Sequence, residues 1–141
     1  FFDFAHYVNI KPMVNQLQCN VMTQQTGIEP LLKETQTRMM AWGPLGGQGV
    51  DGIVKNETLA AIGEKYGKTA AQVALRWLTQ RGVVAIPKSS HKERMRQNFD
   101  IFDFTISCDE MGQISTLNQH DEGTVNFGDP AFVKYLIETY G

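Results

Sequence analysis

Residues 69–98 read TAAQVALRWLTQRGVVAIPKSSHKERMRQN, and this stretch decides the fold. Its first part predicts a helix, because Thr69 is a suitable N-cap and the apolar residues after it lie on one stripe of a 3.6-residue period. That stripe consists of Ala70, Val73, Ala74, Trp77 and Leu78. We expect the helix to end at Gly82, because glycine readily adopts the left-handed conformation of a helix exit.

Three short apolar runs predict strands, at residues 13–17, 39–42 and 83–86. None alternates polar with apolar residues, which favours burial on both faces, as in a parallel sheet. After the third run, Ser90 and Glu93 stand at capping-box spacing and predict the start of another helix. Strands that alternate with helices indicate an α/β protein.

Further helices are expected between and after these strands. Pro30 suits the first turn of a short helix over residues 27–34, and Asn56 is a suitable N-cap for the segment that follows it. Ser107 and Glu110 repeat the capping-box spacing before a helix over residues 109–117. Residues 118–130 are interpreted as a polar loop, and residues 131–137 as a terminal helix or a tail.

Composition limits the function classes. The chain has 141 residues, 42% of them hydrophobic, which predicts one folded domain with a core. Lys and Arg number 13 against 15 Asp and Glu, so the charge of −2 disfavours a nucleic-acid partner. The sequence contains no apolar run of the roughly 20 residues that a membrane helix needs, so no membrane partner is expected. Cys19 and Cys108 form no Cys-x-x-Cys pair, which favours a reducing, cytoplasmic compartment and predicts no metal site.

Two motifs are candidates for ligand binding. The glycines at 47, 49 and 52 match a dinucleotide fingerprint by letter, but three residues intervene before the expected cap at Asn56, so a flexible loop at a strand end is favoured. At the end of the third strand, Lys88, Ser89 and Ser90 directly precede a helix whose N-terminus attracts anions. An anion site and a capped surface helix with solvated charges both remain open on these residues alone.

Four segments together resemble the second half of an aldo-keto reductase. They are residues 12–16 (PMVNQ), 41–47 (AWGPLGG), 69–77 (TAAQVALRW) and 86–98 (IPKSSHKERMRQN), in the order and at the spacing of that family. The resemblance implies an α/β fold that is the C-terminal part of a TIM (β/α)₈ barrel. Residues 1–141 would then form a single partial domain, holding roughly the last three β/α units and a C-terminal helix or tail.

The same resemblance implies a site for NADP(H). Lys88, Ser89 and Arg94 would hold the adenosine 2′-phosphate, while Gln97 and Asn98 would bind the adenine. This is the outer half of the expected cofactor site.

The inner half is implied by the two earlier strands. Trp42 would stack on the nicotinamide ring, and Gln16, expected at the end of its strand, would hydrogen-bond the carboxamide. Gly43, Leu45 and their loop would contact the pyrophosphate through backbone groups. Without the resemblance, Trp42 is interpreted as a core aromatic and Gln16 as a polar residue bonded to backbone.

The family's catalytic Asp, Tyr, Lys and His have no counterpart in this sequence, so no catalytic residue is predicted. His6, His91 and His120 match no catalytic position and are interpreted as ordinary surface or helix-end histidines. The chain begins at Phe1 rather than Met, and we expect it to be part of a longer protein or a truncated product. The 141 residues alone are expected not to reduce carbonyls.

Two functions are therefore carried forward. The first is NADP(H)-dependent reduction of a small carbonyl substrate, with this chain as the cofactor-binding half. The second is a nucleotide-sensing or interaction protein that keeps the fold without turnover. An open half-barrel also leaves unpaired strand edges, which predicts self-association.

Overall fold

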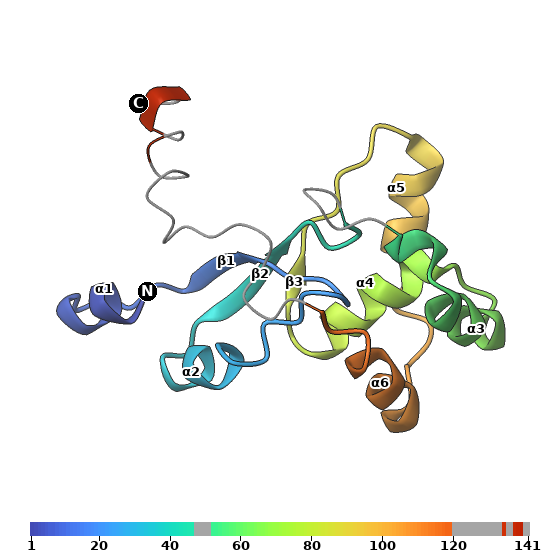
Figure 1. The fold of residues 1–141 in the computed structure, drawn as a ribbon, viewed down its shortest axis with the longest axis horizontal. Helices are drawn as coiled ribbons and strands as arrows, with labels where there is room; N and C mark the ends of the chain where they lie inside the picture. The colour runs from blue at the N-terminus through green and yellow to red at the C-terminus, as the bar shows by residue number, and fades with distance from the viewer. Residues whose placement is uncertain (47–51, 120–133, 135–136, 140–141) are drawn as a thin grey trace.

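The computed structural model describes residues 1–46 and 52–119, together with residues 134 and 137–139 (Figure 1). Three parallel strands form its sheet in the order β1-β2-β3. They are β1 (Val14–Gln18), β2 (Arg38–Trp42) and β3 (Val84–Ala85). The three predicted strands and their parallel pairing are confirmed.

The third strand is shorter than the predicted run 83–86. The backbone N–H of Val83 donates to the Leu78 carbonyl at 3.0 Å and is used by the end of the preceding helix. Gly82 supplies the predicted left-handed exit there, with φ of 77°. Beyond the strand, the backbone N–H of Ile86 still donates to the Ala41 carbonyl at 3.2 Å. Because Val83 is used at the end of the preceding helix, only Val84 and Ala85 pair regularly with β2.

Six α-helices and one 3₁₀ turn are assigned in the described ranges, apart from the residues near the C-terminus. They are α1 (Phe2–Tyr7), α2 (Glu29–Glu34), the 3₁₀ turn η1 (Ile53–Lys55), α3 (Glu57–Tyr66), α4 (Ala70–Gln80), α5 (Lys92–Phe99) and α6 (Cys108–Ser115). The predicted caps of three helices are confirmed: Asn56 caps α3, Thr69 caps α4 and Ser107 caps α6. In α4 and α6 the cap is a full capping box, with Gln72 and Glu110 as the partners.

The capping box expected at Ser90 and Glu93 is wrong. Helix α5 begins at Lys92, its N-cap is His91, and no side-chain hydrogen bond caps it. The hydroxyl of Ser89 instead accepts a hydrogen bond from the backbone N–H of His91 at 3.2 Å. The helix therefore starts one residue later than the spacing implied, with His91 rather than Ser90 at the N-cap position.

The expectation that the strands are buried on both faces is also wrong. Met39 and Ala41 on β2 are buried in the core, whereas Met40 and Trp42 between them are only half-buried. On β1, Val14 and Gln16 are exposed. Helices α2 and α4 pack beside β2 and β3 (Figure 1). The core residues of the sheet belong to one face. The sheet therefore has a covered face and an open face within the described residues.

The core lies between the covered face and helices α3, α4 and α6. Its fully buried members include Leu59, Ile62, Leu75, Leu78 and Ile114. The predicted stripe of α4 is confirmed, because all five of its residues, Ala70, Val73, Ala74, Trp77 and Leu78, are buried. Helices far apart in sequence are thus fixed against one another by apolar contact.

The predicted loop 118–130 and terminal segment 131–137 lie largely outside the described residues. The same holds for residues 47–51 of the glycine motif and for His120. In the part of the chain that is described, no helix has the length and apolar character needed to cross a membrane.

Candidate cofactor-binding site

The carboxyl ends of β2 and β3 open toward the same side of the molecule. Strand β2 ends at Trp42, and Gly43 follows with φ of 60°, a left-handed conformation that glycine adopts without strain. The Gly43 carbonyl accepts a hydrogen bond from the backbone N–H of Gly46 at 3.1 Å, which closes a tight turn. Leu45 lies inside that turn and is half-buried. The turn carries Leu45 toward the segment that follows β3.

One pocket of about 550 Å³ collects most of the predicted site residues. Its wall contains Leu45, Lys88, Ser89, Arg94, Gln97 and Asn98, all of which were predicted to bind cofactor, and also Val54, Thr69, Ala71, Ser90 and His91. The lining comes from the turn after β2, the segment before α5 and α5 itself, with further residues from η1 and from the start of α4. Residues separated by more than 40 positions in sequence, Leu45 and Lys88, therefore share one cavity.

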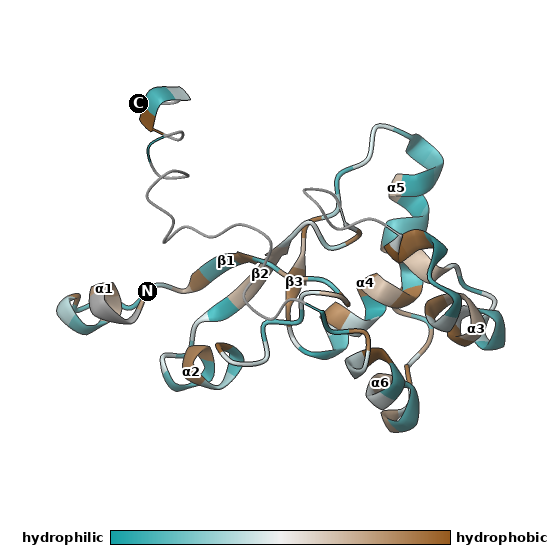
Figure 2. Ribbon diagram, in the orientation of Figure 1, coloured by the Kyte–Doolittle hydropathy of each residue, from teal (hydrophilic) through white to brown (hydrophobic). Residues whose placement is uncertain are grey.

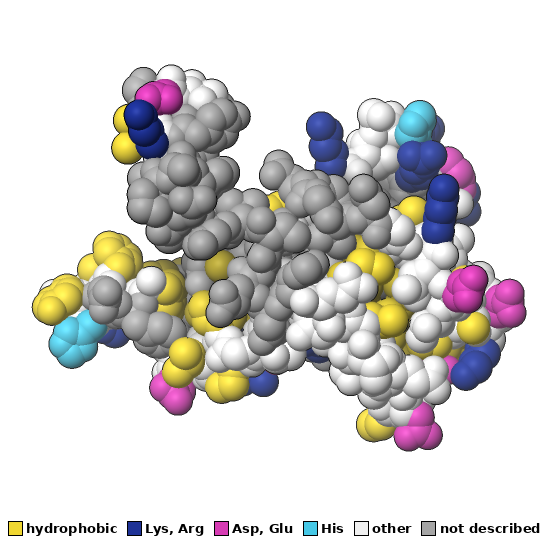
Figure 3. Space-filling model, viewed as in Figure 1, with side chains coloured by type: hydrophobic (Ala, Val, Ile, Leu, Met, Phe, Trp, Pro, Cys, Tyr) yellow, Lys and Arg dark blue, Asp and Glu magenta, His cyan; other side chains and the backbone are white. Residues whose placement is uncertain are grey.

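The pocket is suited to a phosphate group. Lys88 and Arg94 contribute positive charge, and His91 stands at the N-terminus of α5, whose first backbone N–H groups lack helical acceptors. No carboxylate belongs to the described lining. Lys, Arg and His side chains gather over α5 on the face shown in Figure 3. Charge-assisted hydrogen bonds from such groups are the strong ones in anion recognition.

Three predicted residues lie outside this pocket wall. Gly43 is in the adjoining turn, and Trp42 ends β2 without belonging to the core cluster, which argues against the core-aromatic interpretation. Gln16 is the third residue of the five-residue strand β1, so its expected place at the strand end is wrong. It lies in register with Met40, is exposed, and occupies the open face of the sheet. The roles of these three residues stay predictions.

Sequence reasoning missed His91, which lines the pocket, and Asn20, which contacts the adjoining turn. Ser90, which the sequence grouped with Lys88 and Ser89 in the candidate anion site, also lines the pocket. For His91, the place in the turn before α5 was the available signal. Asn20 is completely buried and donates from Nδ2 to the Gly43 carbonyl at 3.1 Å. An asparagine just beyond a strand end has no distinctive pattern, so this contact could not be found from spacing.

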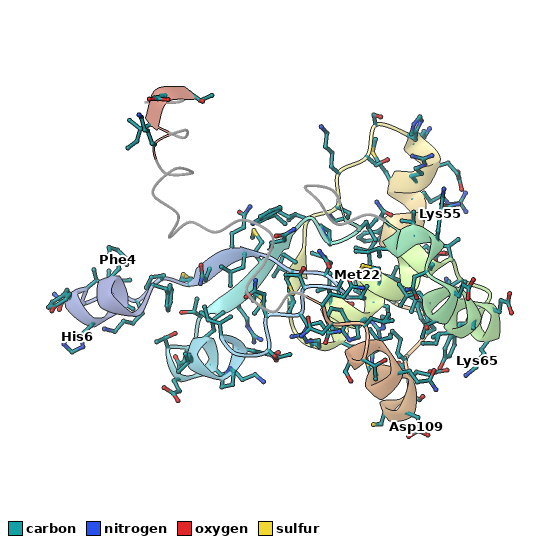
Figure 4. All side chains as sticks on the ribbon, in the orientation of Figure 1. Phe4, His6, Met22, Lys55, Lys65 and Asp109 are labelled. Atoms are coloured by element: carbon teal, nitrogen blue, oxygen red, sulfur yellow. The ribbon has the colours of Figure 1, made fainter. Side chains whose placement is uncertain are left out.

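The described residues place neither a metal-binding cluster nor a tyrosine at the pocket. In the described residues, no group of three or more His, Cys, Asp or Glu side chains could hold a metal ion. Tyr66 donates to Oε2 of Glu110 at 2.7 Å, and this hydrogen bond raises the pKa of Tyr66 above its ordinary value. Tyr7 lies on α1, whose residues Phe4 and His6 stand at the opposite end of the molecule from Lys65 and Asp109 (Figure 4).

The fold and the pocket together define a β/α protein with a cationic pocket at the carboxyl ends of its strands. Comparison of the chain with known protein families identifies its class more closely. The sequence profile of the Aldo/keto reductase family matches residues 6–119. The chain therefore belongs to the aldo/keto reductase family, and its open three-stranded sheet matches part of that family's TIM-barrel fold.

Curated relatives carry several reductase names. A 9,11-endoperoxide prostaglandin H2 reductase of Trypanosoma cruzi is 42% identical over 110 residues, covering 78% of this chain and 39% of the relative. A glyoxal reductase of Bacillus subtilis is 43% identical over 113 residues, covering 79% of this chain and 40% of the relative. The chain thus spans well under half the length of these relatives.

Solved structures agree with the sequence relatives. An aldo-keto reductase from a Medee basin deep-sea metagenome library is 36% identical with a TM-score of 0.81, covering 87% of this chain and 45% of that one. An aldo-keto reductase of Bombyx mori, solved in complex with NADP, is 29% identical with a TM-score of 0.79. That match covers 91% of this chain and 44% of the other.

Proposed function

We propose that this chain is the NADP(H)-binding part of an aldo-keto reductase and corresponds to the last three β/α units of the barrel. The observation that carries the proposal is the convergence of Leu45, Lys88, Ser89, Arg94, Gln97 and Asn98 on one cationic pocket of about 550 Å³. A TIM-barrel enzyme places its site at the carboxyl ends of the strands, which is where this pocket lies.

The outer part of the pocket suits the adenosine end of the cofactor. In this proposal Lys88, Ser89 and Arg94 bind the 2′-phosphate, because two cations and a hydroxyl match its charge and its acceptor oxygens. Gln97 and Asn98, one turn further along α5, are half-buried and bind the adenine. Their amide groups offer both donors and acceptors to the base edge.

The inner part suits the reactive end. Trp42 presents its indole at the end of β2 and stacks on the nicotinamide, while Gln16 bonds the carboxamide. The backbone of Gly43 and Leu45 contacts the pyrophosphate. When bound, NADP(H) supplies the hydride for reduction of a small carbonyl compound. Addition of NADPH is accordingly expected to quench Trp42 emission, and Trp42→Phe to remove that response while the emission of Trp77 is unchanged.

We further propose, as the family resemblance implies, that the proton for carbonyl reduction is donated by a part of the barrel outside residues 1–141, since none of the described tyrosines is placed to donate it at the pocket. Tyr66 is committed to Glu110, and Tyr7 is 84% exposed on α1, away from the pocket. A positioned general acid supplies roughly 10²–10⁴-fold in rate, so its lack removes turnover even when the cofactor is bound. We therefore propose that the 141-residue chain alone binds NADPH without reducing aldehydes. Steady NADPH consumption by a clean preparation would refute this part of the proposal.

A direct test compares NADPH with NADH by titration. We expect NADPH to bind on the order of a hundredfold more tightly, because the 2′-phosphate contacts are charge-assisted. Arg94→Ala is expected to erase much of that difference while sparing NADH affinity. Arg96→Ala is the matched control, since Arg96 is an exposed cation of the same helix that does not line this pocket. Equal losses for both dinucleotides in Arg94→Ala would contradict the assignment.

The rival function, a nucleotide sensor without turnover, uses the same pocket. It differs in the longer protein, where a sensor would lack the Asp, Tyr, Lys and His of the family. If the longer protein reduces carbonyls and loses this activity when its Tyr is replaced by Phe, the protein is an enzyme. Binding of NADPH without any turnover by the longer protein would decide for the sensor.

The open sheet supports the predicted self-association. Strand β3 forms one edge of the sheet, and an apolar groove of about 580 Å³ lies beside it. Val84, Met95, Phe99 and Phe102 line this groove and remain 43–77% exposed. We propose that a second copy covers this edge. Native mass spectrometry at increasing concentration should detect dimers or larger species that Phe99→Asp removes, and a strictly monomeric wild type would contradict the proposal.

A further inference from the structure

The strand pairing of β1 with β2 continues beyond the ends of both strands. The backbone N–H of Cys19 donates to the Trp42 carbonyl at 3.2 Å. At the next position, the side chain of Asn20 donates from Nδ2 to the Gly43 carbonyl at 3.1 Å. Two consecutive residues after β1 therefore hold two consecutive carbonyls at the end of β2, first by backbone and then by a side chain.

The carboxamide of Asn20 is itself held in place. Its Oδ1 accepts a hydrogen bond from the backbone N–H of Met22 at 2.9 Å. The backbone of Asn20 pairs with Thr23 in both directions, at 2.9 and 3.1 Å, and Asn20 is fully buried. Met22 lies near the centre of the view in Figure 4. Because the amide oxygen faces a donor and the amide nitrogen faces an acceptor, the orientation of the carboxamide is determined.

The Gly43 carbonyl links two loops next to the pocket. It accepts from Asn20 and also from the backbone N–H of Gly46, so it joins the turn after β2 to the loop after β1. Trp42 precedes this carbonyl directly, and Leu45 lies within the turn and lines the cationic pocket. Asn20 does not belong to the described lining of that pocket. Any influence of Asn20 on a ligand must pass through the turn.

We propose that Asn20 is a positioning residue, whose carboxamide fixes the turn at Gly43 and thereby the placement of Trp42 and Leu45 for the cofactor. The cofactor half of this inference rests on the proposed function. The inference that Asn20 fixes the turn at Gly43 is independent of the proposed function, because it depends only on the hydrogen bonds of the unliganded chain. A buried hydrogen bond of this kind, once broken, also leaves the carbonyl without one of its donors.

The experiment replaces Asn20 by Ser and by Asp. A Ser hydroxyl can still accept from the backbone N–H of Met22 but is too short to reach Gly43. Asp keeps the shape of Asn and loses the donor. Thr23→Val is the matched control, because Thr23 is equally buried in the same loop and its Oγ1 has no hydrogen-bond partner among the described residues. Circular dichroism first establishes that each variant is folded, and either Asn20 variant suffices if the other does not fold.

The first measurement is hydrogen exchange without cofactor. We expect the amide of Gly46 to exchange about tenfold faster in Asn20→Ser than in the wild type, and to be unchanged in Thr23→Val. Trp42 emission, recorded in a Trp77→Phe background, is expected to shift in the Asn20 variants alone. Unchanged exchange and emission in a folded Asn20 variant would overturn the proposal.

The second measurement is titration with NADPH and NADH. A displaced turn should weaken both dinucleotides by the same factor, about tenfold, because the contacts of Lys88 and Arg94 with the 2′-phosphate are not affected. The ratio of the two affinities then stays at its wild-type value, unlike the result expected for Arg94→Ala. A changed ratio, or no loss for either dinucleotide, overturns the cofactor role of Asn20. A wild type that binds neither dinucleotide overturns the proposed function. In that case the hydrogen-exchange measurement alone tests whether Asn20 fixes the turn at Gly43.

Discussion

Helices α4 and α5 flank the same short strand, β3, yet they are built in different ways. Helix α4 begins with a full capping box and buries seven residues, from Ala70 to Leu78. Helix α5 has no side-chain cap and no buried residue. In Figure 2 most of α5 has the colour of hydrophilic residues. The first helix is fixed by the core, and the second presents polar side chains to the pocket.

With the proposed function, the difference teaches that stability and binding are expected to reside in separate helices on either side of one strand. Substitutions in α4 should lower the free energy of unfolding, whereas substitutions in α5 should lower the affinity for the cofactor. An exposed helix without a cap contributes little to stability, because apolar burial supplies most of the free energy that holds a helix in a protein. Variants of the two helices test this separation, and Glu110 in α6 tests the packed side of the molecule independently.

The largest effect is expected in the core of α4. Leu78 is fully buried, so Leu78→Ala should lower the free energy of unfolding by about 2–5 kcal/mol, through lost apolar burial and the cavity that remains. Urea denaturation measures the change. Met95→Ala is the control in α5, where the side chain is 49% exposed and the expected loss is small. Similar losses in the two variants would remove the contrast between the helices.

Next in size is a pH effect on the core side of the molecule, at Glu110. Burial raises the pKa of this carboxyl, but hydrogen bonds from Tyr66, Ser107 and Lys65 outweigh it and lower the pKa from 4.5 to about 2. The folded state therefore favours the charged form. The resulting stability is present above pH 4.5 and is lost as the pH falls toward 2, with a magnitude of up to about 3 kcal/mol.

Urea denaturation at a series of pH values tests this effect. Glu110→Gln should flatten the fall in stability between pH 4.5 and 2. Glu93→Gln is the control, because Glu93 is an exposed residue in the first turn of α5 and should leave the profile unchanged. An unaltered pH profile in Glu110→Gln would show that the network around Glu110 contributes nothing to stability.

A smaller change in stability separates the two helix starts. Thr69→Ala removes the cap of α4 and should cost about 1 kcal/mol in the free energy of unfolding. His91→Ala changes the equivalent N-cap position of α5, which has no cap bond, and should cost less than about 0.5 kcal/mol. Thermal unfolding of the two variants side by side measures the difference. A larger loss for His91→Ala would mean that α5 depends on its N-cap after all.

The smallest expected change in stability belongs to Arg94→Ala. Because Arg94 is exposed on α5, its loss should alter the free energy of unfolding by no more than about 0.5 kcal/mol. The same variant is expected to lose most of the preference for NADPH over NADH. Denaturation and titration of one preparation compare both quantities. A strongly destabilised Arg94→Ala would refute the separation of binding from stability in this unit.

Sequence reasoning predicted the packed side of the molecule better than the open side. The caps at Asn56, Thr69 and Ser107 and the apolar stripe of α4 were all found, since each depends on residues three or four positions apart. The cap of α5 was misassigned, because a hydrogen bond between Ser89 and His91 competes with the capping box. Spacing alone does not say which of two local hydrogen bonds forms.

At the site, the segment from Lys88 to Asn98 could be grouped from sequence because its residues are neighbours on one turn and one helix. The arrival of Leu45 in the same pocket was implied only by the family resemblance. The contact of Asn20 with Gly43 was not predicted at all. It joins loops after two different strands and depends on how those strands align.

The sequence by itself determined the α/β class, the three strands and the helix starts at Asn56, Thr69 and Ser107, because these depend on short-range periodicity and local hydrogen bonds. Only the tertiary structure decided that one face of the sheet is open, that Gln16 lies in mid-strand, and that Asn20 reaches Gly43. The physical reason is that burial and long-range hydrogen bonds follow from the register of β1 on β2 and from which elements cover the sheet. No local pattern encodes either of these.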